Sequence, residues 1–178
     1  MMCAIDVTPT LSTERLLLRG EVNADAKRIA ELLGDPAISA MTTSIPHPFD
    51  VADAERWLAH CHGVDWEREA QFVIEHRHFG LVGALGFRPG ALGRPEIGYW
   101  LGRPHWNRGY ATEAVRAALS WVRRDWRRKL VVGGHFADNP ASGQVLCKAG
   151  FLYTGDTALR WSQARQGPVR TRMMVWLA

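Results

Sequence analysis

The sequence predicts an α+β protein in which helices accompany a mostly antiparallel sheet. Three strand-like segments, residues 71–77, 80–89 and 96–101, follow one another closely, which is typical of an antiparallel meander. A long apolar stripe at helical spacing then begins at Gly109 and continues to about Arg128. The complete element order that we predict is β-α-α-β-β-β-α-β-α-β-β.

Two helices are expected before the meander. Residues 14–20 predict a first strand, and residues 23–36 predict a helix that Asn23 caps and Gly34 ends. Asp50 is in position to cap a second helix. The apolar face of that helix combines Val51, Ala54, Trp57, Leu58 and Cys61.

After the long helix, residues 129–136 predict a short buried strand. Residues 139–150 predict a short helix, because Asn139 is a good N-cap and Pro140 suits the first helical position. The chain should end in two strands, "FLYTGDTAL" and "RTRMMVWLA", joined by a polar loop.

Length and composition favour a single globular domain over residues 1–178. No segment begins like a secretory signal or is long and apolar enough to cross a bilayer, so we expect a soluble, cytoplasmic protein without a membrane partner. Cys3, Cys61 and Cys147 are too few and too scattered for a disulfide framework or a zinc ribbon, and we expect reduced thiols.

The stretch "PHWNRGYATEAV", residues 104–115, predicts an anion site at the start of the long helix. Free N–H groups and the positive end of the helix dipole face the preceding loop. Gly109 permits close approach of a phosphate, and Arg103 and Arg108 can neutralise it. A diphosphate fits these groups best, and the absence of the Walker and dinucleotide glycine patterns argues against a nucleoside triphosphate or NAD. The alternative is that Gly109 only begins a helix.

Three segments together resemble the Gcn5-related N-acetyltransferase (GNAT) superfamily, in particular its RimJ/RimL-like branch. They are "STERLLLR", "EIGYWLGRPHWNRGYATEAVRAALSW" and "NPASGQVLCKAGF". The resemblance implies a central mixed, mostly antiparallel sheet of about seven strands with helices on both faces. It also implies that the sheet splays between its fourth and fifth strands, and that acetyl-CoA lies in the gap and donates its acetyl group to a primary amine.

The resemblance also implies which residues hold the acetyl-CoA. Trp106 stands where the superfamily's loop pattern begins with Gln or Arg, but tryptophan there is similar to the RimJ/RimL-like branch. Asn139 would contact the pantetheine amides, and Arg103 would add positive charge. The pantetheine arm would pair with the backbone of Trp100, Leu101 and Gly102, and the pyrophosphate with that of Asn107, Arg108, Gly109, Tyr110, Ala111 and Thr112.

Acetyl transfer to an amine needs a base for the amine and a proton for the departing thiolate. Many superfamily members carry a tyrosine acid where this chain has Leu146, and the resemblance implies that Ser142 replaces it. Glu96 is the first candidate base, directly or through water, and His135 is the second. Branch members often have a glutamate where this chain has Thr154. Purely structural roles remain the alternative for all three candidates.

The acceptor could be a protein N-terminal amine or a small molecule, as in an antibiotic or amino-acid acetylase. By family analogy residues 44–50 and 162–168 flank the acceptor side, together with Trp57, Phe87 and Trp161. A CoA-binding sensor with little turnover is a further alternative.

One basic segment and two histidine-containing segments have simpler explanations than a binding site. "RRDWRRK", residues 123–129, could bind nucleic acid but more readily forms a solvated helix end, so nucleic acid is not an expected partner. "HCH" (60–62) and "HRH" (76–78) place neighbouring side chains in different directions, and we expect no metal. The eight tryptophans make an exposed aromatic patch, and with it a homodimer contact, plausible.

Overall fold

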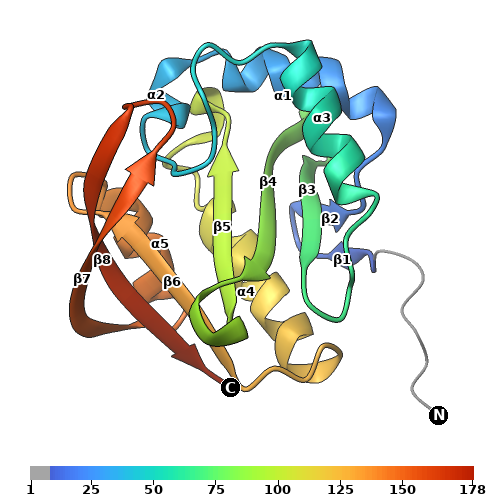
Figure 1. Cartoon of the computed structure of the whole chain (residues 1–178). Coiled ribbons are helices and arrows are strands. Elements are labelled where there is room, and N and C mark those ends of the chain that lie inside the picture. Colours follow the sequence, from blue (N-terminus) through green and yellow to red (C-terminus); the bar gives the residue numbers. More distant parts are fainter. Residues whose placement is uncertain (1–8) are drawn as a thin grey trace.

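In the computed structural model, which describes residues 9–178, a single eight-stranded sheet runs through the molecule (Figure 1). Its spatial order is β1-β2-β3-β4-β5-β6-β8-β7. All neighbouring strands are antiparallel except β5 and β6, which are parallel. The strands are β1 (Leu11–Ser12), β2 (Leu16–Arg19), β3 (Ala70–His76), β4 (Gly80–Pro89), β5 (Pro95–Leu101), β6 (Leu130–Phe136), β7 (Leu152–Ser162) and β8 (Gly167–Leu177).

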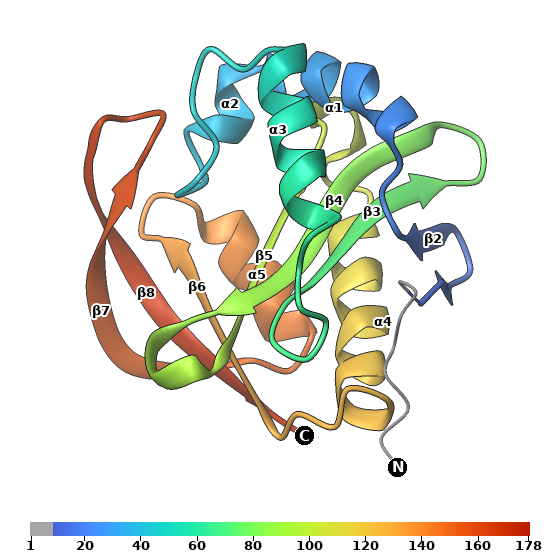
Figure 2. The same cartoon turned by 45° about the vertical axis from the view of Figure 1, so that its right-hand side comes forward.

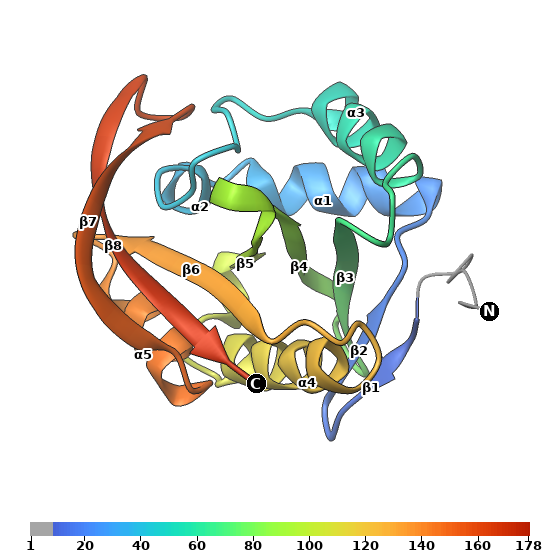
Figure 3. The same ribbon diagram turned by 60° about the horizontal axis from the view of Figure 1, so that its bottom comes forward.

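Helices cover both faces of this sheet (Figure 3). One face carries α1 (Ala26–Leu33) and α3 (Val51–Cys61), and the other carries α4 (Tyr110–Arg124) and α5 (Pro140–Lys148). A short helix, α2 (Pro36–Ser39), follows α1, and 3-10 turns occupy Asn23–Asp25, Ala91–Gly93 and Arg103–His105. The α+β class and helices on both faces are confirmed.

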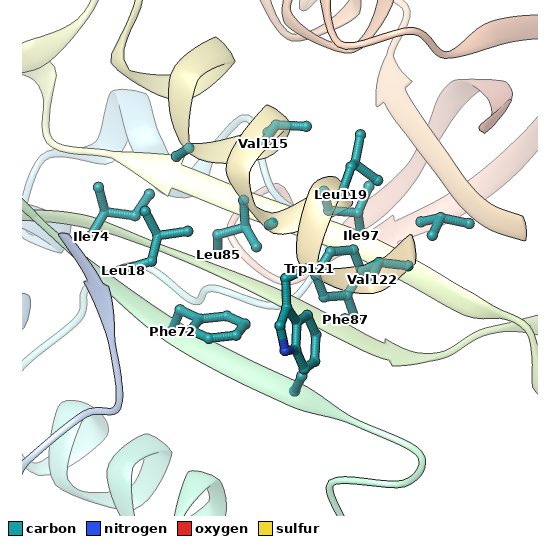
Figure 4. Close-up of a cluster of buried hydrophobic side chains, with 14 of the residues drawn as sticks. Leu18, Phe72, Ile74, Leu85, Phe87, Ile97, Val115, Leu119, Trp121 and Val122 are labelled. Carbon is teal, nitrogen blue, oxygen red and sulfur yellow. The ribbon is translucent and has the colours of Figure 1, made fainter. Parts of the chain in front are cut away.

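The larger hydrophobic core lies between the sheet and α4 (Figure 4). Phe72 and Phe87 of the sheet contact the indole of Trp121, which is 2% exposed. A second core lies under α1 and α3, where Ile29, Leu58 and Val73 meet. Trp106 and Trp161 are the only tryptophans among the exposed large hydrophobic residues of the described chain, so most of this residue type builds the interior.

The sheet splays between β5 and β6 (Figure 1). The two strands pair only at Glu96 and Val132, whereas β4 and β5 stay in register from Gly83 and Leu101 to Pro89 and Pro95. Beyond that single pair the facing edges of β5 and β6 diverge. The gap that the resemblance implies between the fourth and fifth predicted strands is therefore present, and the short β1 brings the number of strands to eight.

Some predicted element ends were wrong. Asn23 does not cap α1 but lies in a 3-10 turn, and Asp25 precedes the helix without a side-chain cap bond. The predicted 23–36 helix stops at Gly34, as expected, because Asp35 then caps the separate helix α2 through the N–H of Ala37. Asp50 caps α3 through the N–H of Asp53, as predicted. Within residues 9–178 none of the helices has the length and hydrophobicity to span a bilayer.

Candidate active site

The loop before α4 is shaped to present backbone N–H groups to solvent. Gly109 is the N-cap of α4 and has a φ of 79°, in the left-handed region that favours glycine. Asn107 also has a positive φ, 59°. Asn107, Arg108 and Gly109 are exposed, and no side chain caps the helix start. The free N–H groups and the positive end of the helix dipole thus remain available to an anion.

Arg15 fixes this loop from β2's side of the molecule, and sequence reasoning missed it. Its Nη1 donates to the carbonyl of Arg108 at 3.0 Å, and its Nε donates to Glu113 of α4 at 2.7 Å. Burial disfavours the charged form of Glu113, but hydrogen bonds from Thr13 and Arg15 outweigh it and lower the pKa of this carboxyl. The guanidinium also lies 4.7 Å from the ring centroid of Tyr110. Arg15, whose charge is paired with Glu113, therefore ties the Arg108 carbonyl of the loop to the first turn of α4.

At the edge of β5, the backbone N–H and C=O groups of every second residue point into the gap. The N–H of Gly102 donates to Val82 of β4 at 2.8 Å, and a Cβ on Gly83 of β4 would overlap the carbonyl oxygen of Trp100. The backbone groups of Trp100 and Gly102 thus point toward β4, and those of Leu101 point away from it. The indole of Trp106 donates to the Leu101 carbonyl at 2.7 Å. That bond gives Trp106 a local role in holding the loop against β5.

Ser142 lies in the first turn of α5, as predicted, and is held from two sides. Its N–H donates to Oδ1 of the N-cap Asn139 at 3.2 Å. Its hydroxyl lies 2.8 Å from the hydroxyl of Tyr99 on β5, which is also 3.0 Å from the Ser142 carbonyl. Burial raises the pKa of Tyr99, so the phenol keeps its proton. This pair bridges the gap between β5 and α5.

A cleft of about 440 Å³ connects Ser142 and Tyr99 with the opposite face of the sheet. Glu96 lines it, and its carboxylate is 3.2 Å from Arg160 and 4.0 Å from Arg88. On the far side the cleft is lined by partly buried apolar residues of the second core, namely Ile45, Phe49, Trp57 and Trp100.

His135 lies on the α5 face of β6, and both of its ring nitrogens have partners. Nδ1 is 2.8 Å from the carbonyl of Phe136, and Nε2 is 2.9 Å from the hydroxyl of Tyr153. Since a carbonyl only accepts, Nδ1 carries the proton and Nε2 accepts from Tyr153. A Cβ on Gly143 would lie 2.6 Å from Nε2, so α5 packs tightly on this ring. This arrangement gives His135 no free nitrogen for an incoming amine.

Several other expectations have clear outcomes. Phe87 is fully buried in the core and cannot line an acceptor site, and Trp126 is 8% exposed and bonded to Trp66, which removes it as a stacking surface. Arg103 is 3.6 Å from Asp35 rather than free. Leu146 is buried, so a core side chain replaces the tyrosine acid.

The remaining outcomes concern metal ligands and cysteines. Among residues 9–178 no group of three or more His, Cys, Asp or Glu is placed to hold a metal ion. Cys61 and Cys147 are free thiols, and Cys3 lies outside the described residues.

Comparison with known proteins places this arrangement in a family. A model of the acetyltransferase (GNAT) domain matches residues 15–152. The chain belongs to the GNAT acetyltransferase family. It is thus an N-acetyltransferase with acetyl-CoA as its co-substrate, and the acceptor is the open question.

Curated relatives carry the same description. The uncharacterized N-acetyltransferase p20 of Bacillus licheniformis is 33% identical over 63% of this chain and 65% of its own length. The uncharacterized N-acetyltransferase YoaA of Bacillus subtilis is 27% identical over 83% of this chain and 85% of its own length. The chain thus spans slightly less than two thirds of p20 and most of YoaA.

Solved structures share the fold. RimJ of Mycobacterium smegmatis in complex with CoA-disulfide has a TM-score of 0.84 and 18% identity, covering 97% of this chain and 89% of that one. The microcin C7 self-immunity acetyltransferase MccE, in complex with acetyl-CoA and AMP, has a TM-score of 0.83 and 15% identity, covering 98% and 99%. At these identities the likeness concerns the fold.

Proposed function

We propose that this acetyltransferase passes the acetyl group of acetyl-CoA to a primary amine by direct attack, without a covalent enzyme intermediate. The observation that carries the proposal is the hydrogen-bonded pair of Ser142 and Tyr99 at the open gap between β5 and β6. The acceptor amine belongs to a small molecule or to a polypeptide N-terminus. The Ser142–Tyr99 pair thus provides a proton donor at one end of the cleft, and the other end has room for the acceptor.

The acetyl-CoA is held by backbone groups more than by side chains. Its pyrophosphate binds the N–H groups of residues 107–112, with positive charge from Arg108, while Arg15 holds the Arg108 carbonyl in place. Arg103 contributes less, because Asp35 already pairs with it. The pantetheine arm pairs with the outward-facing backbone of Leu101 and meets Asn139 across the gap.

Ser142 supplies the proton that the departing thiolate needs. The single proton of Tyr99 can go to the Ser142 carbonyl or to its hydroxyl oxygen. When Tyr99 donates to the hydroxyl oxygen, the Ser142 proton is free to point at the sulfur. The raised pKa of Tyr99 keeps that donor available across the neutral range.

Glu96 serves as the base, directly or through a water. It accepts one proton from the acceptor ammonium, and the neutral amine then attacks the thioester carbon. The carbon–sulfur bond breaks and the thiolate takes a proton from Ser142, while the second proton of the attacking nitrogen passes through water to Ser142 and restores its hydroxyl. His135 remains a weaker candidate because both of its nitrogens are engaged.

The proposal is tested by measuring CoA release and acetylated product with a panel of amines and peptides. Ser142→Ala should lower kcat by about 100-fold, and Tyr99→Phe by about tenfold, with KM for acetyl-CoA nearly unchanged. Tyr153→Phe removes an equivalent hydroxyl from the His135 side and is the matched control.

Two results would contradict the proposal. Equal losses in the two tyrosine variants would implicate the His135–Tyr153 pair instead of Tyr99. Acetyl-CoA binding without turnover on any acceptor would indicate a sensor rather than an enzyme.

A further inference from the structure

Two arginines share one carboxylate in the cleft. Arg160 of β7 donates to Oε2 of Glu96 at 3.2 Å, and Arg88 of β4 lies 4.0 Å from Oε1. The Glu96 side chain is 14% exposed, whereas those of Arg88 and Arg160 are 43% and 33% exposed. One positive charge of this cluster is therefore left without a matching carboxylate in the trio.

Most hydrogen-bond donors of the two guanidinium groups are unused. Arg88 donates to Thr43 at 3.2 Å and Arg160 to Glu96, and these are their only side-chain hydrogen bonds within residues 9–178. Each guanidinium has five N–H donors arranged to bind a carboxylate with two parallel bonds. The cluster thus offers donors and charge to an anion that enters the cleft.

The floor beside this cluster is open. Gly98 of β5 pairs with Gly86 of β4, and a Cβ added to Gly98 would meet nothing within 4 Å. Gly98 lies two residues beyond Glu96, on the same face of the strand. At the far end of the floor, the ring systems of Phe49, Trp57 and Trp100 form an apolar wall.

The tip of the β7–β8 hairpin, whose arc is visible in Figure 2, contacts the segment that follows α2. Ser162 donates to the carbonyl of Thr42 at 3.1 Å, and the N–H of Gln163 donates to the carbonyl of Thr43 at 2.9 Å. Arg165 donates to the carbonyl of Ala40 at 2.6 Å. These contacts hold the hairpin that carries Arg160 beside the cleft.

We propose that the acceptor is a free α-amino acid with a large apolar side chain. Arg88 and Arg160 bind its carboxylate, Glu96 receives the adjacent ammonium, and the side chain extends over Gly98 to the wall formed by Phe49, Trp57 and Trp100. An α-amino acid places its two charged groups on one carbon, which matches a carboxylate flanked by two guanidinium groups. The N-terminal residue of a peptide lacks that free carboxylate. The assignment rests on the proposed acetyl transfer.

The test compares amines that differ only in the carboxylate. Phenylalanine, leucine and tryptophan are assayed beside their amides and their decarboxylated amines, by CoA release and by the mass of the product. The free acids should have kcat/KM values roughly 10- to 100-fold above those of the amides, as expected for charge-assisted hydrogen bonds. O-Phosphoethanolamine and an N-terminal peptide complete the panel.

Two variants test whether Arg160 causes the preference for free amino acids. Arg160→Gln should lower kcat/KM for the free acids by roughly 10- to 100-fold, and by a much smaller factor for the decarboxylated amines. Arg94→Gln removes the same charge from the exposed turn between β4 and β5 and is the matched control, with no expected change. Calorimetric binding of N-acetylphenylalanine should be lost in Arg160→Gln, which gives a readout independent of turnover.

The outcomes separate the two proposals. Acetylation of amides, peptides or O-phosphoethanolamine at least as fast as of free acids would overturn the amino-acid assignment and leave the acetyl transfer standing. Equal losses for acids and amines in Arg160→Gln would also overturn it, because they would show that Arg160 acts only through Glu96. Absence of turnover on the whole panel, with acetyl-CoA bound, would overturn both.

Discussion

His105 is a buried histidine whose two ring nitrogens have no hydrogen-bond partner among the described residues. It is 6% exposed, and its ring lies 5.5 Å from that of Phe79 at an angle of 43°. Burial lowers its pKa, and the nearby charges of Arg28 and Arg108 and the ring of His76 lower it further. His105 thus stays neutral in the folded protein.

This burial should make the fold sensitive to mild acid. Between about pH 6.5, the usual pKa of histidine, and the lowered pKa, the unfolded chain binds more protons than the folded chain. The free energy of unfolding therefore decreases as pH falls through that window and is highest above it. The unfolding temperature should fall measurably between pH 7.5 and 5.5.

His105→Leu should flatten this pH dependence, because the ring loses no hydrogen bond when an apolar side chain replaces it. His47→Gln removes an exposed histidine that has no part in this cluster, and it is the control that should keep the wild-type slope. Burial also lowers the pKa of His76, and this histidine accounts for the slope that remains. An unchanged slope in His105→Leu would refute this role.

Single residues were predictable where their partners are close in the sequence. Asn139 and Ser142 are three positions apart, so the cap and the first-turn hydroxyl follow from local helix chemistry. Tyr99 and Arg15 were missed because their partners lie 43 and 98 positions away in the chain. No local pattern distinguishes such residues from ordinary strand residues.

At the scale of the element, the start of α4 depends on the backbone of Gly109. Its φ of 79° is unfavourable for any residue with a Cβ, by about 1 to 2 kcal/mol. An added Cβ would lie 3.4 Å from Nη2 of Arg15, which is ordinary contact, so strain and not a clash is the expected effect.

Gly109→Ala should therefore raise KM for acetyl-CoA about tenfold while leaving a folded protein. The change shifts the loop away from the conformation that presents its N–H groups. Gly93→Ala, at a φ of 68° in the turn between β4 and β5, carries similar strain away from the loop and should leave KM unchanged. Titration calorimetry with CoA measures the effect directly, and equal affinity in the two variants would contradict it.

Element types were well predicted by periodicity, and their ends less well. The strands at 80–89 and 96–101 and the start of the helix after Gly109 match the structure closely, because each has a clear alternation or stripe. That helix ends at Arg124 instead of about Arg128. The first helix begins at Ala26 instead of after Asn23, because a 3-10 turn precedes it.

At the scale of the whole molecule, the β7–β8 hairpin joins the two halves of the splayed sheet. Arg165 near its tip contacts the carbonyl of Ala40 and pairs with Asp138 at 2.7 Å. Its guanidinium also lies 5.1 Å from the ring centroid of Phe136. One side chain thus joins the hairpin to the end of α2 and to β6.

Arg165→Ala should raise KM for the acceptor roughly fivefold and leave KM for acetyl-CoA nearly unchanged, because the lost hydrogen bonds loosen the hairpin that carries Arg160. Arg170→Ala removes an exposed arginine of the same hairpin and is the control. Steady-state kinetics with each substrate varied in turn separates the two constants. Equal effects on both would show that the hairpin supports the whole fold instead.

From local sequence alone the element types, the uncapped glycine start of α4 and the serine in the first turn of α5 could be predicted. Each of these follows from spacing and caps within about one helical turn or strand. Only the tertiary structure decided that Tyr99 meets Ser142, that Phe87 is core, and that Arg88 and Arg160 share Glu96. Those contacts depend on the splay and curvature of the sheet, which bring strands far apart in the chain to one cleft.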